Sequence, residues 1–183
     1  MNLGIDFDGT IADSTQEKIR AAREMFGVAM RPEHAGRAPG RRLMGRQRYD
    51  AVARSIYSSE KTLELPPVDE ATEGIRSLSG RYNLYVVTAR DKKQSELAST
   101  WLLARSLPIT GVLYTSESGK RAACESHGIG VILDDTPEVL ADFTDAGIVP
   151  VLLSRPYNLG ARLAEGARRA SSWRDFVDLV DKL

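Results

Sequence analysis

The feature of this sequence that most restricts its fold is a repeated alternation of short apolar runs with longer segments of helical period. The runs lack polar alternation, which is typical of parallel strands covered by helices on both faces. We expect strands at Leu3–Phe7, Leu84–Thr88, Val112–Thr115, Val131–Leu133 and Val149–Leu153. Helical periods fall at Ala71–Leu78, Lys92–Arg105, Gly119–His127, Pro137–Ala146 and Ser172–Leu183. This order predicts an α/β fold, with a doubly wound parallel sheet of about five strands and right-handed crossovers.

The stretch from Ser14 to Pro67 departs from the alternation, because it is far longer than a normal crossover and contains no convincing strand. Thr15–Phe26 and Arg46–Tyr57 have a helical period. Turn-forming residues between them indicate an irregular connection: Pro32, Gly36, Pro39, Gly40 and Gly45. We therefore expect a Rossmann-like core made of residues 1–14 and 67–183, and a small helical cap at residues 15–66 over one end of the sheet.

The charges are balanced over the whole chain but not within the expected cap. The 25 basic and 25 acidic residues cancel, so no general field attracts nucleic acid or a membrane surface. Between Arg20 and Arg54, however, nine arginines stand against Glu24, Glu33 and Asp50. A positive segment of this kind predicts an anionic ligand nearby, although a solvated surface would have the same composition.

Other compositional features exclude several classes of protein. Cys124 is the single cysteine, so the chain has no internal disulfide and no cysteine-based metal site. No apolar run approaches the roughly 20 residues of a membrane span, and nothing resembles a signal peptide. A cytoplasmic location is expected by default.

The first expected strand runs directly into Asp6-Phe7-Asp8-Gly9-Thr10. In an open α/β sheet, ligands bind beyond the carboxyl ends of the strands. Residues two apart in an extended strand point to the same side, so Asp6 and Asp8 can approach one ligand. Gly9 permits a tight turn whose amides, with those around Thr10, can face an anion. Paired carboxylates repel unless a cation neutralises them, which favours Mg²⁺.

Further polar residues follow later strands. Thr88 ends the second strand, Asp134 and Asp135 end the fourth, and Lys120 opens the helix between these positions. Because the carboxyl ends of parallel strands lie at one edge, these groups are expected close to Asp6. Carboxylates for a metal, one hydroxyl and one ammonium are the groups needed to hold a phosphoryl group during transfer.

With these four motifs in this order, the sequence resembles the haloacid dehalogenase superfamily of phosphohydrolases over nearly the whole chain outside the insertion. The resemblance implies that Asp6 is the nucleophile, and that Asp8 is the general acid and then the base. It also implies that Thr88 and Lys120 hold phosphate oxygens. Mg²⁺ would bind the Asp6 side chain, the Asp8 backbone carbonyl and Asp135, with Asp134 acting indirectly or through water. Dehalogenating members lack an aspartate at the position of Asp8, which favours a phosphatase.

The cap and the loops suggest the substrate less specifically. Family members carry a helical cap after the first motif, and here Arg41, Arg42, Arg46 and Arg48 are candidates for holding an anionic leaving group. Deleting cap arginines should then raise KM for large anionic substrates more than for a small synthetic ester.

A narrower resemblance to 5′-nucleotidases of the deoxyribonucleotidase type rests on Val87-Thr88-Ala89-Arg90, Trp101 and Arg155-Pro156-Tyr157-Asn158. It implies a nucleoside monophosphate substrate, with Arg90 able to reach the phosphate. Polynucleotide ends and sugar or metabolite phosphates stay open as substrates. The expected partner is a small phosphorylated molecule, and the protein can be a monomer or a homodimer.

Other classes of protein match the residues less well. A phosphoacceptor receiver domain also uses an acidic pair, a Thr and a Lys, but it has no insertion after the first strand. The residues around Lys120 do not match the phosphate-binding loop of nucleoside triphosphatases, because Tyr114 stands where glycine is needed and Arg121 where Ser or Thr is needed. A phosphate-binding regulatory module without turnover remains the alternative of another class. Steady phosphate release would distinguish an enzyme from it.

Overall fold

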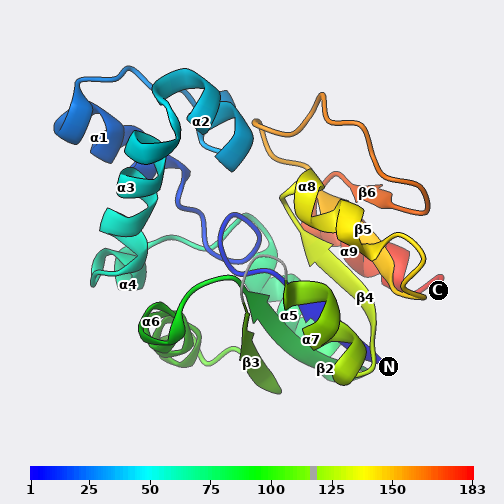
Figure 1. The fold of residues 1–183 in the computed structure, drawn as a ribbon. Helices are drawn as coiled ribbons and strands as arrows, with labels where there is room; N and C mark the ends of the chain where they lie inside the picture. Colours follow the sequence, from blue (N-terminus) through cyan, green and yellow to red (C-terminus); the bar gives the residue numbers. More distant parts are fainter. Residues whose placement is uncertain (116–118) are drawn as a thin grey trace.

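The computed structural model describes residues 1–115 and 119–183, and its centre is a parallel sheet of six strands in the order β3-β2-β1-β4-β5-β6 (Figure 1). All five expected strands are present, and the α/β class is confirmed. Their bounds are β1 Asn2–Ile5, β2 Asn83–Thr88, β3 Gly111–Tyr114, β4 Ile129–Asp134 and β5 Val149–Leu153. The sixth strand, β6 (Arg168–Ala170), is a short edge strand that pairs with β5 and was not expected.

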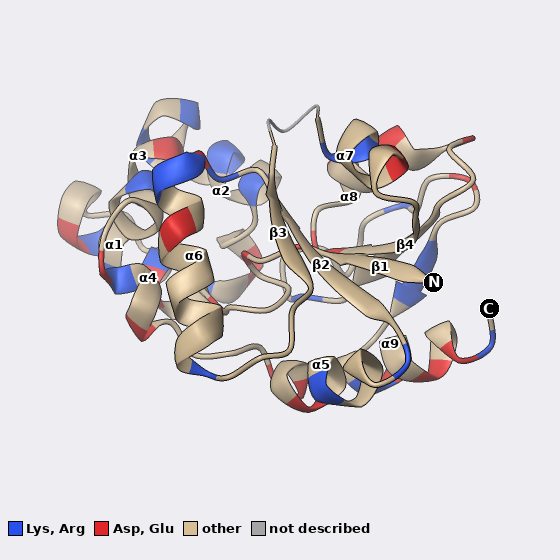
Figure 2. Ribbon diagram, turned by 90° about the horizontal axis from the view of Figure 1, so that it is seen from below, with Lys and Arg blue, Asp and Glu red and all other residues tan. Residues whose placement is uncertain are grey.

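Helices cover both faces of the sheet, which explains why its strands are apolar on both sides. One face packs against α5 (Ala71–Ser79), α6 (Lys92–Ala104) and α9 (Trp173–Val180). The other packs against α7 (Lys120–Ser126) and α8 (Pro137–Leu140). Figure 2 shows the sheet between these two layers. The helix expected over residues 137–146 stops being α-helical after Leu140 and continues as the 3-10 turn η3 (Ala141–Phe143).

Residues 15–66 form a group of helices beside the sheet, seen in blue to green-cyan in Figure 1. The helices are α1 (Thr15–Phe26), α2 (Arg37–Met44), α3 (Arg46–Tyr57) and α4 (Lys61–Glu64), with a 3-10 turn η1 (Pro32–His34) before α2. They have a small apolar core of their own, which contains Ala22, Met44, Tyr49 and Val52 among others. This core belongs to α1, α2 and α3, whereas α4 packs mainly on α6, and Ile56 and Leu65 are part of the main core. Helices α1 and α3 have the bounds expected from the sequence.

Helix α2 lies where an irregular connection was expected, and that expectation was wrong. Pro39 falls in the first turn of the helix, where its missing N–H costs no hydrogen bond. Gly40 lies against the ring of Tyr49, and a Cβ there would stand 2.2 Å from Tyr49 Cε2. The glycine that weakens the helix locally is thus required by the close packing of α2 on α3.

None of the described helices is long and apolar enough to span a membrane.

Candidate active site

The centre of the candidate site is the carboxyl end of β1, where the order of the strands reverses. Strand β1 lies between β2 and β4, with Ile5 in register with Val86 and Leu133. The backbone N–H of Asp6 donates to the carbonyl of Leu133 at 2.8 Å, which extends the sheet by one residue and fixes the start of the acidic motif. The residues after β1 and β4 therefore meet at one edge, as expected for a ligand site at a switch point.

Lys120 lies between two of the carboxylates at this edge. Its ammonium group donates to Asp6 Oδ1 at 2.5 Å and to Asp134 Oδ2 at 2.7 Å, and the Lys120 side chain is buried. The other oxygen of Asp134 accepts from the N–H of Thr136 at 2.8 Å. Both oxygens of Asp134 are therefore engaged within the protein, and Lys120 is held beside Asp6.

Asp135 is supported from the loop that follows β5. The hydroxyl of Tyr157 donates to Asp135 Oδ2 at 2.5 Å, and the amide of Asn158 donates to the Asp135 carbonyl at 2.8 Å. Gly9 has a positive φ of 88°, and a Cβ there would stand 2.4 Å from Asp135 Oδ2 and 2.5 Å from the Tyr157 hydroxyl. Only glycine allows the first loop to approach Asp135 this closely.

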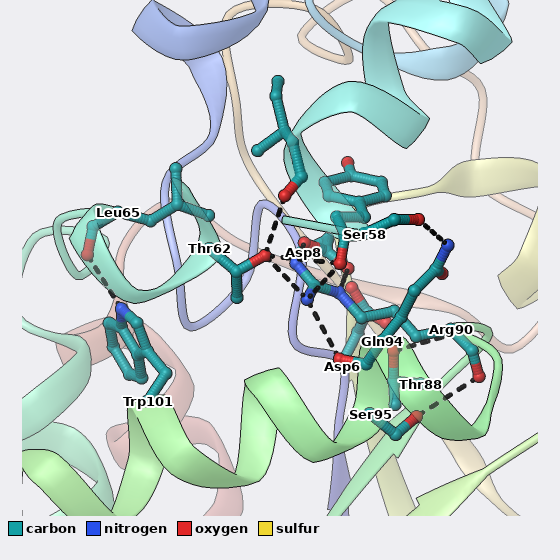
Figure 3. A network of polar contacts seen from close by, with 12 residues as sticks. Asp6, Asp8, Ser58, Thr62, Leu65, Thr88, Arg90, Gln94, Ser95 and Trp101 are labelled. Atoms are coloured by element: carbon teal, nitrogen blue, oxygen red, sulfur yellow. Dashed lines mark hydrogen bonds and ion pairs between the residues drawn. The ribbon is translucent and has the colours of Figure 1, made fainter. Parts of the chain in front are cut away.

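Asp8 is held by Arg90, in a network that Figure 3 shows from close by. Arg90 Nε and Nη2 each donate to one oxygen of Asp8 at 2.8 Å, which is a bidentate ion pair. Arg90 Nη1 donates to Thr62 Oγ1 at 3.1 Å, and the guanidinium lies over the rings of Phe7 and Tyr57. The same arginine thus connects the first motif to helices α3 and α4.

The electrostatics of the site reflect burial of several carboxylates together. Burial raises the pKa of the Asp6 carboxyl well above its ordinary value; Lys120 opposes this rise, and Asp134 and Asp135 add to it. Burial, followed by the charge of Asp134, raises the pKa of Asp135 to about 6. Burial lowers the pKa of Lys120, but the carboxylates of Asp134 and Asp6 raise it by more, so the ammonium form is favoured.

The carboxylate oxygens of Asp6, Asp134 and Asp135 suit a hard divalent cation. One oxygen of each can be chosen so that all lie within 4.8 Å of one another. The carboxylates of Asp6, Asp134 and Asp135 together exceed the charge that the Lys120 ammonium can offset, although Lys18 also attracts Asp135 from the cap side. An oxygen-only donor set with excess negative charge is the kind of site that Mg²⁺ prefers.

A cavity of about 430 Å³ opens over these groups, between the sheet edge and the cap helices. The core contributes Asp6, Asp8, Thr88, Lys120 and Asp135 to its lining, with Arg90 beside them. Thr88 is buried, and its hydroxyl accepts from the N–H of Arg90 at 3.3 Å. The structure therefore brings the residues of all four sequence motifs together around one space.

Several candidate residues from the sequence lie elsewhere or have other partners. Arg41 and Arg46 line the cavity, whereas Arg42 lines a neighbouring hollow of about 600 Å³ between α2 and α8. The Gly9 N–H donates to the Ala12 carbonyl at 2.8 Å, and Thr10 is fully buried. Arg48 lies against the ring of Phe26.

The cavity also contains residues that the sequence analysis did not select. They include Lys18 of α1, Arg37 of α2, and Tyr49, Arg54 and Tyr57 of α3. The signal that was available for Arg37 and Arg54 is the arginine excess of the cap, which did not distinguish cavity from surface. Lys18, Tyr49 and Tyr57 carried no signal, because a single lysine or tyrosine on a helix has no distinctive spacing.

Over residues 1–183 the sequence matches the family described as 5′ nucleotidase, deoxy (Pyrimidine), cytosolic type C protein. None of the curated proteins matches this sequence.

Solved structures share the fold at low identity. A haloacid dehalogenase-like family hydrolase from Streptococcus pneumoniae has a TM-score of 0.70 and 15% identity, covering 98% of this chain and 97% of that one. A HAD-superfamily hydrolase of subfamily IA from Geobacter sulfurreducens has a TM-score of 0.63 and 17% identity, with 98% and 95% covered. The D,D-heptose 1,7-bisphosphate phosphatase of B. bronchiseptica, complexed with magnesium and phosphate, has a TM-score of 0.64 and 10% identity, with 100% and 99% covered. The chain shares its fold with haloacid dehalogenase-like hydrolases, and it belongs to the 5′ nucleotidase, deoxy (pyrimidine), cytosolic type C protein family, which is a family of phosphatases.

Proposed function

We propose that this protein hydrolyses phosphomonoesters with Mg²⁺, through an aspartyl-phosphate formed on Asp6. The observation that carries the proposal is the placement of the Asp6 carboxylate at the floor of the cavity, 2.5 Å from the Lys120 ammonium and beside Asp135. A carboxylate nucleophile splits the hydrolysis into two easier displacements. The neighbouring cation keeps that carboxylate oriented and offsets the charge of an incoming phosphate.

In the first displacement an oxygen of Asp6 attacks the phosphorus, the bond from phosphorus to the leaving oxygen breaks, and Asp8 gives that oxygen a proton. In the second, Asp8 takes a proton from water, the water oxygen attacks the phosphorus, and phosphate leaves Asp6. Thr88 and Lys120 hold the other phosphate oxygens during both steps. Mg²⁺, bound by Asp6, the Asp8 carbonyl and Asp135, would offset the charge of the transferring group.

The ion pair between Arg90 and Asp8 sets a condition on this mechanism. Both oxygens of Asp8 accept hydrogen bonds from Arg90, which stabilises the carboxylate form. One of these bonds has to open before Asp8 can carry a proton to the leaving oxygen. We expected Arg90 to contact the substrate phosphate, but its guanidinium is bound to Asp8. We therefore propose that Arg90 positions Asp8.

The partners of their oxygens support Asp135 as a direct metal ligand and Asp134 as an indirect one. Asp134 uses one oxygen for Lys120 and the other for Thr136. Asp135 uses Oδ2 for Tyr157, while its Oδ1 has only a long contact of 3.5 Å with Thr136. Asp135 thus has an oxygen to offer, and Asp134 orients Lys120.

For the substrate, membership of a family described by deoxy pyrimidine 5′-nucleotidase activity supports a nucleoside monophosphate. The cavity of about 430 Å³ has room for a ligand of that size. Sugar and metabolite phosphates and phosphorylated polynucleotide ends belong in the same assay, because the motifs at the sheet edge recognise the phosphoryl group and not the leaving group.

The test is release of phosphate from a panel of phosphomonoesters, with Mg²⁺ and with EDTA, for the wild type and Asp6→Asn. The panel contains deoxynucleoside and nucleoside monophosphates, phosphorylated oligonucleotides, sugar phosphates and p-nitrophenyl phosphate. Asp178→Asn is the matched control, because Asp178 is exposed on α9 and outside the cavity. We expect Mg²⁺-dependent turnover that Asp6→Asn abolishes and Asp178→Asn retains. Turnover by Asp6→Asn, or none by the wild type, would refute the proposal.

A further inference from the structure

The wall of the cavity that faces the sheet edge is formed by cap helices and is strongly basic. Lys18, Arg37, Arg41, Arg46 and Arg54 line it, and Asp50 is the one acid that the described cap residues contribute. Figure 2 shows lysine and arginine segments on α2 and α3. A transferring phosphoryl group is already met by Lys120, Thr88 and the proposed metal on the other side. The cap cations therefore exceed what a single phosphate needs.

The helical period brings the basic residues of α2 and α3 onto the helix faces that line the cavity. On α3, Arg46, Asp50, Ala53, Arg54 and Tyr57 follow one another at spacings that put them on one face, and all line the cavity. On α2, Arg37 and Arg41 are four residues apart and line it too. Ala53, in the middle of the α3 face, leaves room for a ligand between the longer side chains.

Asp50 organises two of these guanidinium groups without neutralising the wall. Its Oδ1 accepts from Arg41 Nε at 2.9 Å and lies 2.8 Å from Arg41 Nη2, and its Oδ2 lies 3.6 Å from Arg46 Nε. One carboxylate thus holds two cations near each other. With Asp50 counted, Arg41 and Arg46 keep one net positive charge and several N–H donors, which suits the binding of a phosphate.

Lys18 adds a buried charge to the same wall. Its ammonium donates to the carbonyl of Ala35 at 3.1 Å and lies near the rings of Tyr49 and Tyr57, at 5.8 and 5.6 Å from their centroids. None of the described carboxylates forms a direct ion pair with this buried ammonium, and Asp135 attracts it only from a longer distance, so an anionic ligand in the cavity would offset its charge.

The aromatic residues of the lining are engaged in other contacts. The Tyr57 ring lies 4.6 Å from the Arg90 guanidinium and 5.6 Å from the Lys18 ammonium. The Tyr49 hydroxyl donates to the Ala35 carbonyl, and its ring packs on Gly40. Among the described lining residues, the cationic groups are therefore better placed to recognise a leaving group than the tyrosine rings are to stack on a base.

From this placement we propose that the cap wall binds a second phosphate, one that stays on the leaving group. The preferred substrate is then a bisphosphorylated molecule, either a nucleoside bisphosphate or a sugar bisphosphate. The inference rests on the proposed phosphatase function. The chemistry of the step is unchanged: the phosphorus–oxygen bond at Asp6 breaks, the leaving oxygen receives the proton from Asp8, and the second phosphate remains esterified in the product.

The experiment compares substrates that differ only in the second phosphate. One pair is a nucleoside 5′-monophosphate and the matching 3′,5′-bisphosphate; the other is a hexose 1-phosphate and the matching 1,6-bisphosphate. We expect kcat/KM to be about tenfold or more higher for one bisphosphate than for its partner, because one charge-assisted hydrogen bond is worth roughly a factor of ten. The pair that shows the preference identifies the class of leaving group.

The double variant Arg46→Gln/Arg54→Gln tests where the second phosphate binds. Both side chains are exposed at the cavity wall, so the fold should be kept, and circular dichroism verifies this. We expect the ratio of kcat/KM for the bisphosphate to kcat/KM for the monophosphate to fall about tenfold in this variant. Arg23→Gln, an exposed arginine of α1 outside the cavity, is the matched control and should retain the preference.

The outcomes separate this inference from the proposed function. Equal kcat/KM within both pairs, or a bisphosphate preference that the double variant keeps, would overturn the second-phosphate site while leaving the phosphatase chemistry intact. Absence of turnover on every ester, p-nitrophenyl phosphate included, would overturn the proposed function and this inference with it.

Discussion

Replacing Arg90 by methionine tests the most heavily connected side chain of the site. The change keeps an unbranched apolar stem but removes the guanidinium that holds Asp8. The Arg90 side chain is 2% exposed and that of Asp8 is 15% exposed, so water can replace the lost contacts only poorly. The Asp8 carboxylate is left largely buried and without its cation.

The expected cost follows from the contacts that disappear. Two hydrogen bonds of 2.8 Å to a charged acceptor contribute about 1.5–3 kcal/mol each. Breaking a buried ion pair by removing one partner costs about 3–5 kcal/mol, which agrees with that sum. We expect Arg90→Met to lower the free energy of unfolding by about 3–5 kcal/mol. In a chain of this size the melting temperature should fall by about 6–20 °C.

The assay is urea unfolding at pH 7 in EDTA, followed by the fluorescence of Trp101 and Trp173, which are both fully buried. Arg90→Met, Asp8→Asn and the double variant form a mutant cycle. Because the unpaired charge is the main cost, the double variant should be more stable than Arg90→Met alone. Arg174→Met is the control, since its pair with Glu70 is exposed and its loss should change stability by at most about 0.5 kcal/mol.

Two results would refute this reasoning. One is a loss below about 1 kcal/mol for Arg90→Met, which would mean that water or another cation replaces the guanidinium. The other is an additive cycle, with the same cost for Asp8→Asn in both backgrounds, which would mean that the two side chains are not coupled.

The remaining predictions concern Asp135. Tyr157→Phe removes the hydroxyl that donates to Asp135 Oδ2, and it should weaken Mg²⁺ binding by about 10- to 100-fold. The affinity is measured from the Mg²⁺ dependence of the melting temperature and of turnover. An unchanged affinity would contradict a positioning role for Tyr157. In EDTA, the pKa of Asp135 is raised to about 6 in the folded protein. Between about pH 4 and about pH 6 the folded protein therefore holds a proton on Asp135 that the unfolded chain has lost. The contribution of Asp135 to the free energy of unfolding thus falls as the pH rises from about 4 to about 6. Asp135→Asn should therefore match the wild type near pH 4 and be more stable at pH 7 by urea unfolding, and a difference that does not grow with pH would contradict the burial argument. Saturating Mg²⁺ should stabilise the wild type at pH 7 and leave Asp135→Asn nearly unchanged.

Much of the fold was readable from the sequence because its signals are local. Unalternated apolar runs located five of the strands, and helical periods gave α1 and α3 with the bounds that the structure has. Strand β6 carried no such signal, since Arg168–Ala170 is three residues long and begins with two arginines. Helix α2 was missed because Pro39 and Gly40 lower local helix propensity, and the contact of Gly40 with Tyr49 outweighs that loss.

The sequence by itself determined which residues would gather at the sheet edge. Thr88 and Asp134 end parallel strands and Asp6 directly follows another, and the carboxyl ends of parallel strands share one edge. Only the tertiary structure decided their partners. Arg90 binds Asp8 across 82 positions and Tyr157 binds Asp135 across 22. The cap wall is also a product of packing, because helical period shows which residues share a face but not which face is turned toward the cavity.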